Sequence, residues 1–438
     1  MRIVVRGGEV VGPDGPVRAD LGVEDGRIVV VGPDLEAPRD AQVVDASGCW
    51  VGPGLVDLHT HLREPGHEEA ETIESGARAA ARGGYSAVVA MPNTEPALDT
   101  AAMVAFVQAR GRGACVEVAV AGAITQGRRG ELLAPMAEMA ALGVRLFTDD
   151  GRGVEDPLVL RRAMEYARGL GVRLAEHCED ERLCADGVMH EGALSGRLGL
   201  VGRPALAEEL MVARDVELAR LTGCALHVMH LSSARALAIV TAARAEGLPV
   251  TAEVTPHHLT LDETAVEGYD PTFKVHPPLR PRRDVDALVA ALRAGSIDAV
   301  ATDHAPHAPE TKDRTFDEAP PGMLGLEHAA ALTLEALGGV DAPGAAVAFF
   351  ERLSRRPARI AGLEVADARS GLGAHGGALV IGEDANLVVF DPRRRWRARR
   401  EDLASRARNT PYHGRDLTGR ARALLVGGRV VLDGEALT

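Results

Sequence analysis

From Pro53 to about Leu337, short apolar runs alternate with longer stretches rich in Ala, Arg, Leu and Glu. Eight of the runs have the length of strands: Gly54–His59, Ser86–Met91, Val116–Gly122, Val144–Thr148, Val172–His177, Ala225–His230, Val250–Thr255 and Ile297–Thr302. The stretches predicted as helices are Glu71–Arg82, Thr100–Arg110, Leu132–Ala141, Pro157–Leu170, Ala205–Leu221, Ala234–Glu246, Arg282–Ala294 and Leu324–Leu337. Near-continuous hydrophobic strands separated by helices indicate a parallel sheet. Eight repeats predict the α/β class and a closed (β/α)8 TIM barrel.

The two ends of the chain show a different pattern, with short β segments broken by Gly, Pro and Asp. At the N-terminus they are Arg2–Val5, Leu21–Val23, Arg27–Val31 and Gln42–Asp45; at the C-terminus they are Ala378–Ile381, Asn386–Phe390, Ala423–Val426 and Arg429–Leu432. We therefore expect residues 1–52 and 371–438 to combine into one small β-sandwich domain, and residues 53–370 to form the barrel.

Composition and charge narrow the functional classes. The chain carries 49 basic and 63 acidic residues, a formal charge of −14, which argues against a nucleic-acid-binding protein with a basic face. The five cysteines follow no disulfide or zinc-ribbon spacing, so a reducing cytoplasm is expected. The N-terminus lacks the apolar stretch of a signal peptide, and no run approaches the length of a transmembrane helix.

Candidate chemistry gathers where the predicted strands end. His59 and His61 end the first strand, and residues two apart on a strand point to the same side. The other candidates end the fourth, fifth, sixth and eighth strands: Asp149 and Asp150, His177, His230, and Asp303. The carboxyl ends of the strands are where a barrel gathers its functional groups. Five strand ends that deliver His or Asp together therefore predict one site.

Four imidazoles and two carboxylates suit zinc or a similar borderline metal. Because a catalytic zinc ion usually takes three protein ligands, four histidines favour two ions bridged by a carboxylate. Such a pair lowers the pKa of a bound water towards about 7 and so supplies hydroxide at neutral pH. Asp303 beside that water would act as the general acid and base.

Several motifs resemble those of the cyclic amidohydrolases. They are His59-x-His61-x-Arg63-x-Pro65-Gly66, Met91-Pro92-Asn93-Thr94, Thr255-Pro256-His257-His258-Leu259, Pro277-Pro278-Leu279-Arg280 and Thr302-Asp303-His304-Ala305-Pro306-His307. The resemblance covers the whole chain and is strongest to the long bacterial type of the dihydroorotase family. It implies reversible cyclisation of N-carbamoyl-L-aspartate to (S)-dihydroorotate in de novo pyrimidine biosynthesis.

The fourth strand separates this family from its relatives. Hydantoinases, allantoinases and many others bridge their metals there with a carbamylated lysine, whereas this chain has Thr148-Asp149-Asp150-Gly151. The only two lysines, Lys274 and Lys312, fall far from that strand in the sequence. The resemblance assigns the bridge to Asp150, His59 and His61 to one zinc ion, and His177 and His230 to the other, with Asp303 as a further ligand.

The resemblance also assigns substrate contacts to Arg63, Asn93, His307 and the backbone at Pro321-Gly322. An arginine close to the ligands can form a forked contact with a carboxylate, which dihydroorotate has. Two positions depart from the family: His276 replaces an asparagine that touches the substrate, and Pro321 replaces a common aromatic. His276 is therefore a candidate substrate contact and keeps open another cyclic amide, such as a hydantoin or allantoin.

Among the remaining histidines, His257 and His304 are the candidates to orient a metal ligand. For partners, the resemblance implies a homo-oligomer and leaves open a complex with aspartate carbamoyltransferase, as an active enzyme or as a non-catalytic partner. The retained ligands favour the active enzyme.

Overall fold

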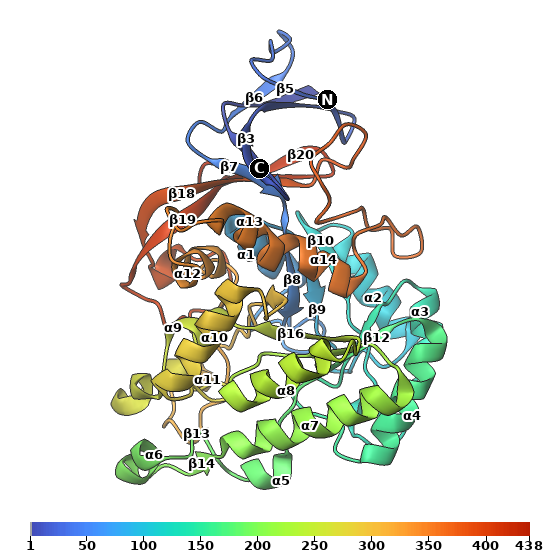
Figure 1. Cartoon of the computed structure of the whole chain (residues 1–438), viewed down its shortest axis with the longest axis vertical. Helices are drawn as coiled ribbons and strands as arrows, with labels where there is room; N and C mark the ends of the chain where they lie inside the picture. Colours follow the sequence, from blue (N-terminus) through green and yellow to red (C-terminus); the bar gives the residue numbers. More distant parts are fainter. Residues whose placement is uncertain (1) are drawn as a thin grey trace.

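In the computed structural model, which describes residues 2–438, eight strands from the middle of the chain pair in parallel (Figure 1). They are β8 (Leu55–Thr60), β9 (Tyr85–Ala90), β10 (Glu117–Val120), β11 (Leu146–Phe147), β12 (Arg173–Glu176), β15 (Leu226–Val228), β16 (Val250–Val254) and β17 (Ala299–Val300). The sheets run β10-β9-β8 and β11-β12-β15-β16-β17. Parallel bridges from Gly122 to Phe147 and from Thr60 to His304 join them, so the pairing returns to β8. Each strand overlaps one predicted run.

The predicted helices between these strands are present. They are α1 (Ile73–Gly83), α2 (Ala101–Gly111), α3 (Met136–Ala141), α4 (Pro157–Leu170), α7 (Ala205–Thr222), α8 (Ala234–Ala245), α10 (Arg282–Ala294) and α12 (Ala329–Ala336). Local sequence explains several ends: Asp156 accepts hydrogen bonds from the first turn of α4, which starts with proline, and Gly171 follows its last residue with φ +68°. Two helices, predicted over Leu132–Ala141 and Leu324–Leu337, begin later in the structure than predicted. Pro135 caps α3, and the amide of Leu324 donates to the carbonyl of Asn409 instead of starting α12.

The strands bury both faces, as their continuous hydrophobicity predicts. In β9, Val88 and Ala90 pack with the surrounding helices, whereas Ala87 and Val89 join a second cluster enclosed by the strands. That second cluster includes Ile360 of α14 (Arg356–Ala361), on the side of the terminal sheets. Apolar side chains thus fill one end of the ring of strands, and the polar candidate residues lie at the other end.

The two termini form two further sheets. The first, in the order β5-β4-β1-β6, contains β1 (Arg2–Arg6), β4 (Asp20–Glu24), β5 (Arg27–Gly32) and β6 (Gln42–Asp45). The second, in the order β21-β20-β19-β18-β7-β2-β3, contains β2 (Glu9–Gly12), β3 (Gly15–Arg18), β7 (Trp50–Pro53), β18 (Leu387–Arg397), β19 (Asp416–Val426), β20 (Arg429–Asp433) and β21 (Ala436–Leu437). β7 pairs antiparallel with β18, so the N-terminal and C-terminal parts combine in one sheet.

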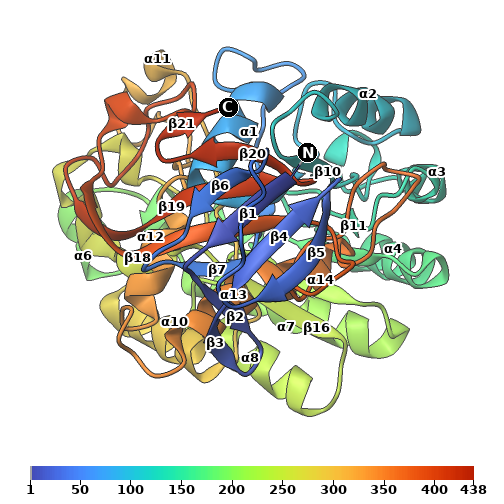
Figure 2. The same cartoon turned by 90° about the horizontal axis from the view of Figure 1, so that it is seen from above.

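An apolar cluster joins the two terminal sheets: Ile3, Leu21 and Val44 of the first meet Leu387 and Leu425 of the second. The opposite face of the larger sheet packs on helices of the central part. Both sheets and both chain ends lie at the top of Figure 1, and Figure 2 shows them crossing over the helices.

One predicted strand is wrong. Ala378–Ile381 has no strand conformation, and Val380 and Ile381 are 50% and 66% exposed. Their side chains have no sheet face to cover, so hydrophobicity there does not lead to strand pairing.

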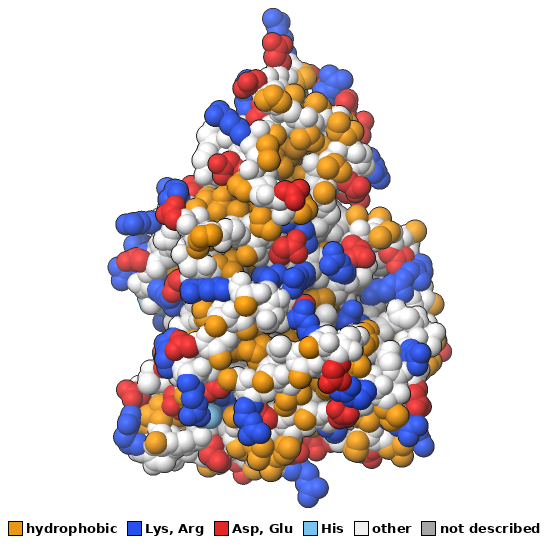
Figure 3. Space-filling view, viewed as in Figure 1, with side chains coloured by type: hydrophobic (Ala, Val, Ile, Leu, Met, Phe, Trp, Pro, Cys, Tyr) orange, Lys and Arg blue, Asp and Glu red, His pale blue; other side chains and the backbone are white. Residues whose placement is uncertain are grey.

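The remaining short elements lie mostly in loops that follow the parallel strands, at the end away from the terminal sheets (Figure 1). They are α5 (Glu181–Cys184), β13 (Met189–His190), α6 (Ala193–Leu198), β14 (Gly202–Arg203), α9 (Pro256–Thr260) and α11 (Pro309–Lys312), with α13 (Ala345–Phe350) preceding α14. Figure 3 shows acidic and basic side chains interspersed on one face. Across residues 2–438, no helix combines the length and apolar character needed to span a bilayer.

Candidate active site

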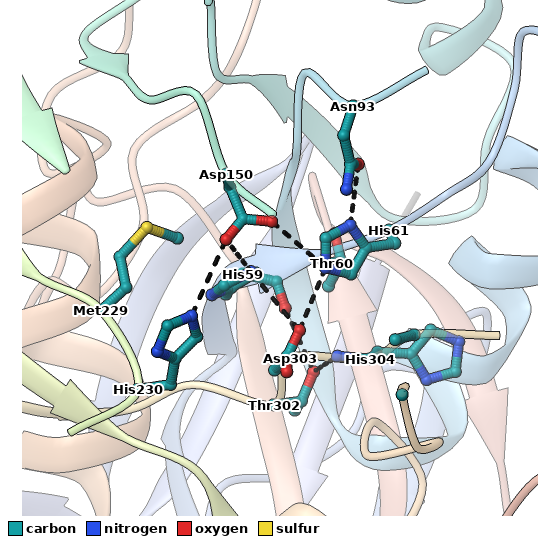
Figure 4. A network of polar contacts seen from close by, with 12 residues as sticks. His59, Thr60, His61, Asn93, Asp150, Met229, His230, Thr302, Asp303 and His304 are labelled. Carbon is teal, nitrogen blue, oxygen red and sulfur yellow. Dashed lines mark hydrogen bonds and ion pairs between the residues drawn. The ribbon is translucent and has the colours of Figure 1, made fainter. Parts of the chain in front are cut away.

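Figure 4 shows His59, His61, Asp150, His230 and Asp303, from four of the strand ends, lying together, and His177 from the fifth strand end contacts the same Asp150. Five of these residues form two groups that share one carboxylate: His59, His61 and Asp150, and then Asp150, His177 and His230. Within each group the ligand atoms lie within 4.8 Å of one another, and all five residues are buried. The structure thus brings these strand ends together around one buried group of His and Asp side chains.

Carboxylates connect the imidazoles. His59 Nε2 lies 3.3 Å from Asp150 Oδ1 and 3.5 Å from Asp303 Oδ1. His61 Nε2 lies 3.0 Å from Asp303 Oδ1 and 3.5 Å from Asp150 Oδ2. On the other side of Asp150, His177 Nδ1 is 3.6 Å and His230 Nε2 is 3.8 Å from Oδ1. Asp150 therefore stands between the two histidine pairs.

The donor set fits divalent metal ions. His59 Nε2, His177 Nδ1 and His230 Nδ1 are buried nitrogens without a hydrogen-bond partner. Buried polar atoms without a partner are costly. Imidazole nitrogen and carboxylate oxygen are ligands that zinc accepts. Two of these nitrogens, His59 Nε2 and His177 Nδ1, face the shared Asp150 carboxylate at 3.3 and 3.6 Å, which is what a site built to hold cations requires.

The two adjacent aspartates make different contacts. The Asp149 carboxylate accepts hydrogen bonds from the amides of Ile124 and Thr125, at 2.8 and 3.0 Å, and from the Thr125 hydroxyl. It thus anchors the loop after β10. Asp150 faces the histidines instead, while its carbonyl accepts from Arg128.

Three polar side chains orient the candidate ligands from behind. His59 Nδ1 lies 3.0 Å from Glu253 Oε1, and His61 Nδ1 lies 2.9 Å from Asn93 Oδ1. His177 Nε2 lies 3.4 Å from Glu179 Oε2. Contacts of this kind fix the ring tautomer of a ligand.

The sequence reasoning missed Glu253 and Glu179. An acidic residue inside the apolar run Val250–Thr255 was an available signal for Glu253. His257 and His304 were only candidates for the orienting role, and within residues 2–438 neither side chain is hydrogen-bonded to a candidate ligand. His257 Nε2 lacks a partner, and His304 Nε2 lies 3.4 Å from Glu71.

A cavity of ≈ 200 Å³ opens beside the ligand groups. All the residues predicted to touch substrate line it, namely Arg63, Asn93, His276, His307, Pro321 and Gly322. Asp150, His177, His230 and Asp303 line it as well. A molecule in this cavity would therefore contact the ligands and the predicted substrate-binding groups together.

Charge in the cavity is mixed. Burial lowers the pKa of Arg63 to about 10, so the guanidinium remains cationic at neutral pH. Burial also lowers the pKa of His276 to about 3, which keeps that ring neutral. Burial opposes ionisation of Asp303, but the nearby His59 and His61 hold its pKa below the usual range. Arg63 thus places a guanidinium charge in the cavity beside the ionised Asp303 carboxylate.

Three residues at this site have strained backbone conformations. Arg63, His230 and Asp303 have positive φ values of 60°, 30° and 46°. Such values are unfavourable for residues with a side chain and collect at functional sites, where the surrounding fold must hold them. Gly322 has φ +136°, and a Cβ there would lie 2.8 Å from the side chains of Ala305 and His307. Glycine is needed at that position.

The whole fold is similar to solved structures. The L-hydantoinase (dihydropyrimidinase) of Arthrobacter aurescens superposes with a TM-score of 0.86 at 23% identity, over 100% of this chain and 97% of that one. A D-hydantoinase (dihydropyrimidinase) from Thermus sp. superposes with a TM-score of 0.82 at 26% identity, over 100% of this chain and 96% of that one. The fold and the site define a metal-dependent hydrolase of cyclic amides.

The sequence matches are more specific. The dihydroorotase of Pelotomaculum thermopropionicum is 46% identical over 436 residues, 99% of each chain, and that of Mycobacterium tuberculosis is 46% identical over 435 residues, 98% of each. The chain belongs to the dihydroorotase family. A family model described as "Dihydro-orotase-like" also matches residues 48–236, which include the four candidate histidine ligands and Asp150.

Proposed function

We propose that this protein is a dihydroorotase that interconverts N-carbamoyl-L-aspartate and (S)-dihydroorotate in de novo pyrimidine biosynthesis. One observation carries the proposal: two histidine pairs share Asp150 beside a cavity that also contains a cationic arginine. The arginine suits the carboxylate that dihydroorotate and its open form both carry. The full-length sequence relatives support the same substrate.

Two zinc ions per subunit are the proposed cofactors. His59 and His61 would hold one ion, His177 and His230 the other, with Asp150 between them and Asp303 as a further ligand. The ions would polarise the ring carbonyl and make a bound water more acidic. Lysine takes no part, because Lys274 Nζ donates to the carbonyl of Asp317 and Lys312 Nζ to those of Pro271 and Pro320.

Substrate binding falls to the other residues that line the cavity. Arg63 Nε donates to the carbonyl of Pro306 at 3.1 Å, which holds the guanidinium in place and leaves its terminal nitrogens for a carboxylate. Asn93 uses its oxygen on His61, so its amide nitrogen remains to donate. His276, with an unpartnered Nε2, and His307 complete the polar contacts, together with the backbone at Pro321 and Gly322.

Asp303 is the proposed general acid and base. In the hydrolytic direction, the water oxygen bonds to the ring carbonyl carbon, and the amide C–N bond breaks. Asp303 accepts one proton from water and delivers it to the departing ring nitrogen, which becomes the terminal NH2 of the ureido group. The second water proton is released to solvent when the new carboxylic acid ionises. Ring closure runs through the same proton transfer in reverse.

The architecture is part of the proposal. We interpret the ring of eight parallel strands, residues 53–370, as a (β/α)8 barrel, and residues 1–52 with 371–438 as one β-sandwich domain. The enzyme is proposed to act in the cytoplasm as a homo-oligomer, with a possible complex with aspartate carbamoyltransferase. Light scattering of the protein alone and with that enzyme tests both associations.

Turnover of dihydroorotate by purified protein, before and after chelation and zinc add-back, tests the function. Metal per chain is counted on the same sample, and about two ions are expected of a paired site. Hydantoin and allantoin serve as competing substrates. Bound metal without dihydroorotate turnover would contradict the proposed substrate, and full turnover after complete metal removal would contradict the metal site.

A further inference from the structure

A segment that lies outside the strand–helix repeats reaches the active site. Residues 403–412 precede β19, and the two walls of the substrate cavity meet at Asn409, which is only 4% exposed. Sequence position alone would assign this segment to the terminal β sheets. Its contacts place it against the loop that follows β17.

The Asn409 side chain joins two stretches of backbone. Its Oδ1 accepts from the amide of His307 at 3.1 Å, and its Nδ2 donates to the carbonyls of Ala305 and Gly322 at 2.9 and 3.2 Å. Its own carbonyl accepts from the amide of Leu324 at 3.2 Å. Both amide hydrogens and the amide oxygen of the side chain are therefore used.

Those two stretches are walls of the cavity. Ala305, His307 and Gly322 all line it, and His307 Nε2 lies 2.8 Å from the carbonyl of Pro321. The stretches approach so closely that a Cβ on Gly322 would lie 2.8 Å from the Cβ of Ala305. A small change in their separation would move the His307 ring relative to the backbone of Gly322.

The segment that carries Asn409 is itself anchored on both sides. On one side, the Ser405 hydroxyl and the Arg406 amide donate to Glu71, the latter at 3.1 Å. On the other side, the Tyr412 hydroxyl lies 3.1 Å from the Thr260 hydroxyl, at the end of α9. Asn409 therefore presents its amide from a fixed backbone rather than from a free loop.

We infer that Asn409 is a positioning residue that sets the spacing between His307 and Gly322 in the substrate pocket. The inference rests on the proposed dihydroorotase activity, because it assigns Asn409 to that substrate. Asn409 lies behind the cavity wall, and its effect on binding passes through His307 and Gly322. Its loss should therefore weaken substrate binding more than it slows the chemical step.

The chain offers a matched control in Asn386. This residue is 3% exposed, its Nδ2 donates to the carbonyl of Ala374 at 2.8 Å, and its Oδ1 accepts from the amide of Gly427 at 2.7 Å. It has the same chemistry and burial but lies among the terminal sheets. Substituting it controls for lost stability.

The experiment compares Asn409→Asp and Asn409→Ser with Asn386→Asp and Asn386→Ser in the zinc-loaded full chain. An aspartate at 409 keeps the acceptor for His307 but loses both donors and faces two carbonyl oxygens. We expect KM for dihydroorotate to rise about tenfold or more, from two lost hydrogen bonds, with kcat changed much less. The serine is smaller and tests the same contacts without the added charge.

The Asn386 variants should lower the melting temperature and leave KM unchanged. Equal KM values in the Asn409 and Asn386 variants would overturn the inference while leaving the proposed function standing. If the wild-type protein fails to turn over dihydroorotate, the proposed function fails instead. In that case, hydrogen exchange of the His307 and Leu324 backbone amides tests the role of Asn409 separately. Faster exchange in Asn409→Ser than in Asn386→Ser supports the positioning role. Equal exchange in the two variants overturns it.

Discussion

His59 Nδ1 and Glu253 Oε1 lie 3.0 Å apart, and neither side chain is exposed to solvent. Glu253 Oε2 lies 3.0 Å from His227 Nε2. The other ring nitrogen of His227, Nδ1, lies 2.9 Å from the Thr251 hydroxyl. Burial opposes ionisation of Glu253, but hydrogen bonds from His227 and His59 lower its pKa to about 2. The resulting carboxylate accepts the Nδ1 proton of His59 and turns the lone pair of Nε2 towards Asp150, where we propose the metal site.

Glu253→Gln should weaken metal binding, because an amide is a poorer acceptor and no longer dictates the His59 tautomer. Loss of a carboxylate that orients a ligand costs about 10–100-fold in metal affinity. Competition with a chelator of known zinc affinity measures the change directly, without reference to turnover. Asp298→Asn is the matched control, since Asp298 is a buried carboxylate that accepts from the amide of Ala252 and lies outside the ligand groups. Equal zinc affinity in the two variants would remove the orienting role.

Asp303→Asn should lower kcat by about 10²–10⁴-fold, the range typical of a lost general acid or base. The amide retains the size of the side chain but cannot take a proton from water. Metal content and the thermal melt are recorded alongside kcat, because Asp303 also lies within 3.0 Å of His61 Nε2. Turnover near the wild-type rate in a metal-loaded variant would exclude Asp303 from proton transfer.

His276→Asn tests the departure from the family pattern. His276 lines the cavity, its Nε2 has no hydrogen-bond partner, and burial lowers its pKa to about 3. The neutral ring can make the hydrogen bond expected of an asparagine, so His276→Asn should keep KM for dihydroorotate close to wild type. His276→Ala should raise KM about 3–10-fold through one lost hydrogen bond. An unchanged KM in the alanine variant would show that His276 does not contact the substrate.

Glu327→Gln should change how stability depends on pH. Burial raises the pKa of Glu327 to about 7, although Arg82 and the amides of Ala404 and Ser405 favour the ionised form. Because the pKa is raised in the folded state, the contribution of Glu327 to the free energy of unfolding is fully present below about pH 4.3. It is lost as pH rises through about 7. The wild type should therefore lose more unfolding free energy between pH 5 and 8 than the glutamine variant. Parallel pH dependence of denaturant unfolding in the two proteins would contradict the raised pKa.

The sequence by itself determined the order of the elements and the candidate ligands. Strand–helix alternation is a local property of hydrophobic spacing, so the eight parallel strands lie where Gly54–His59 and the later runs predicted them. His and Asp at strand ends could be read as one site because parallel strands bring the same ends together. The hydrophobic run Ala378–Ile381 shows the limit of that reasoning, since a strand also needs a neighbour and a face to cover.

Tertiary structure decided which groups support the site. Asp149 and Asp150 are chemically identical in the sequence, and only the position of the Ile124 and Thr125 amides turns the first away from the histidines. Glu253 is 194 residues from His59 along the chain, and Asn409 is 102 from His307. Hydrogen bonds act over about 3 Å, so the partners in each pair depend on how distant segments pack, and no local pattern in the sequence encodes that.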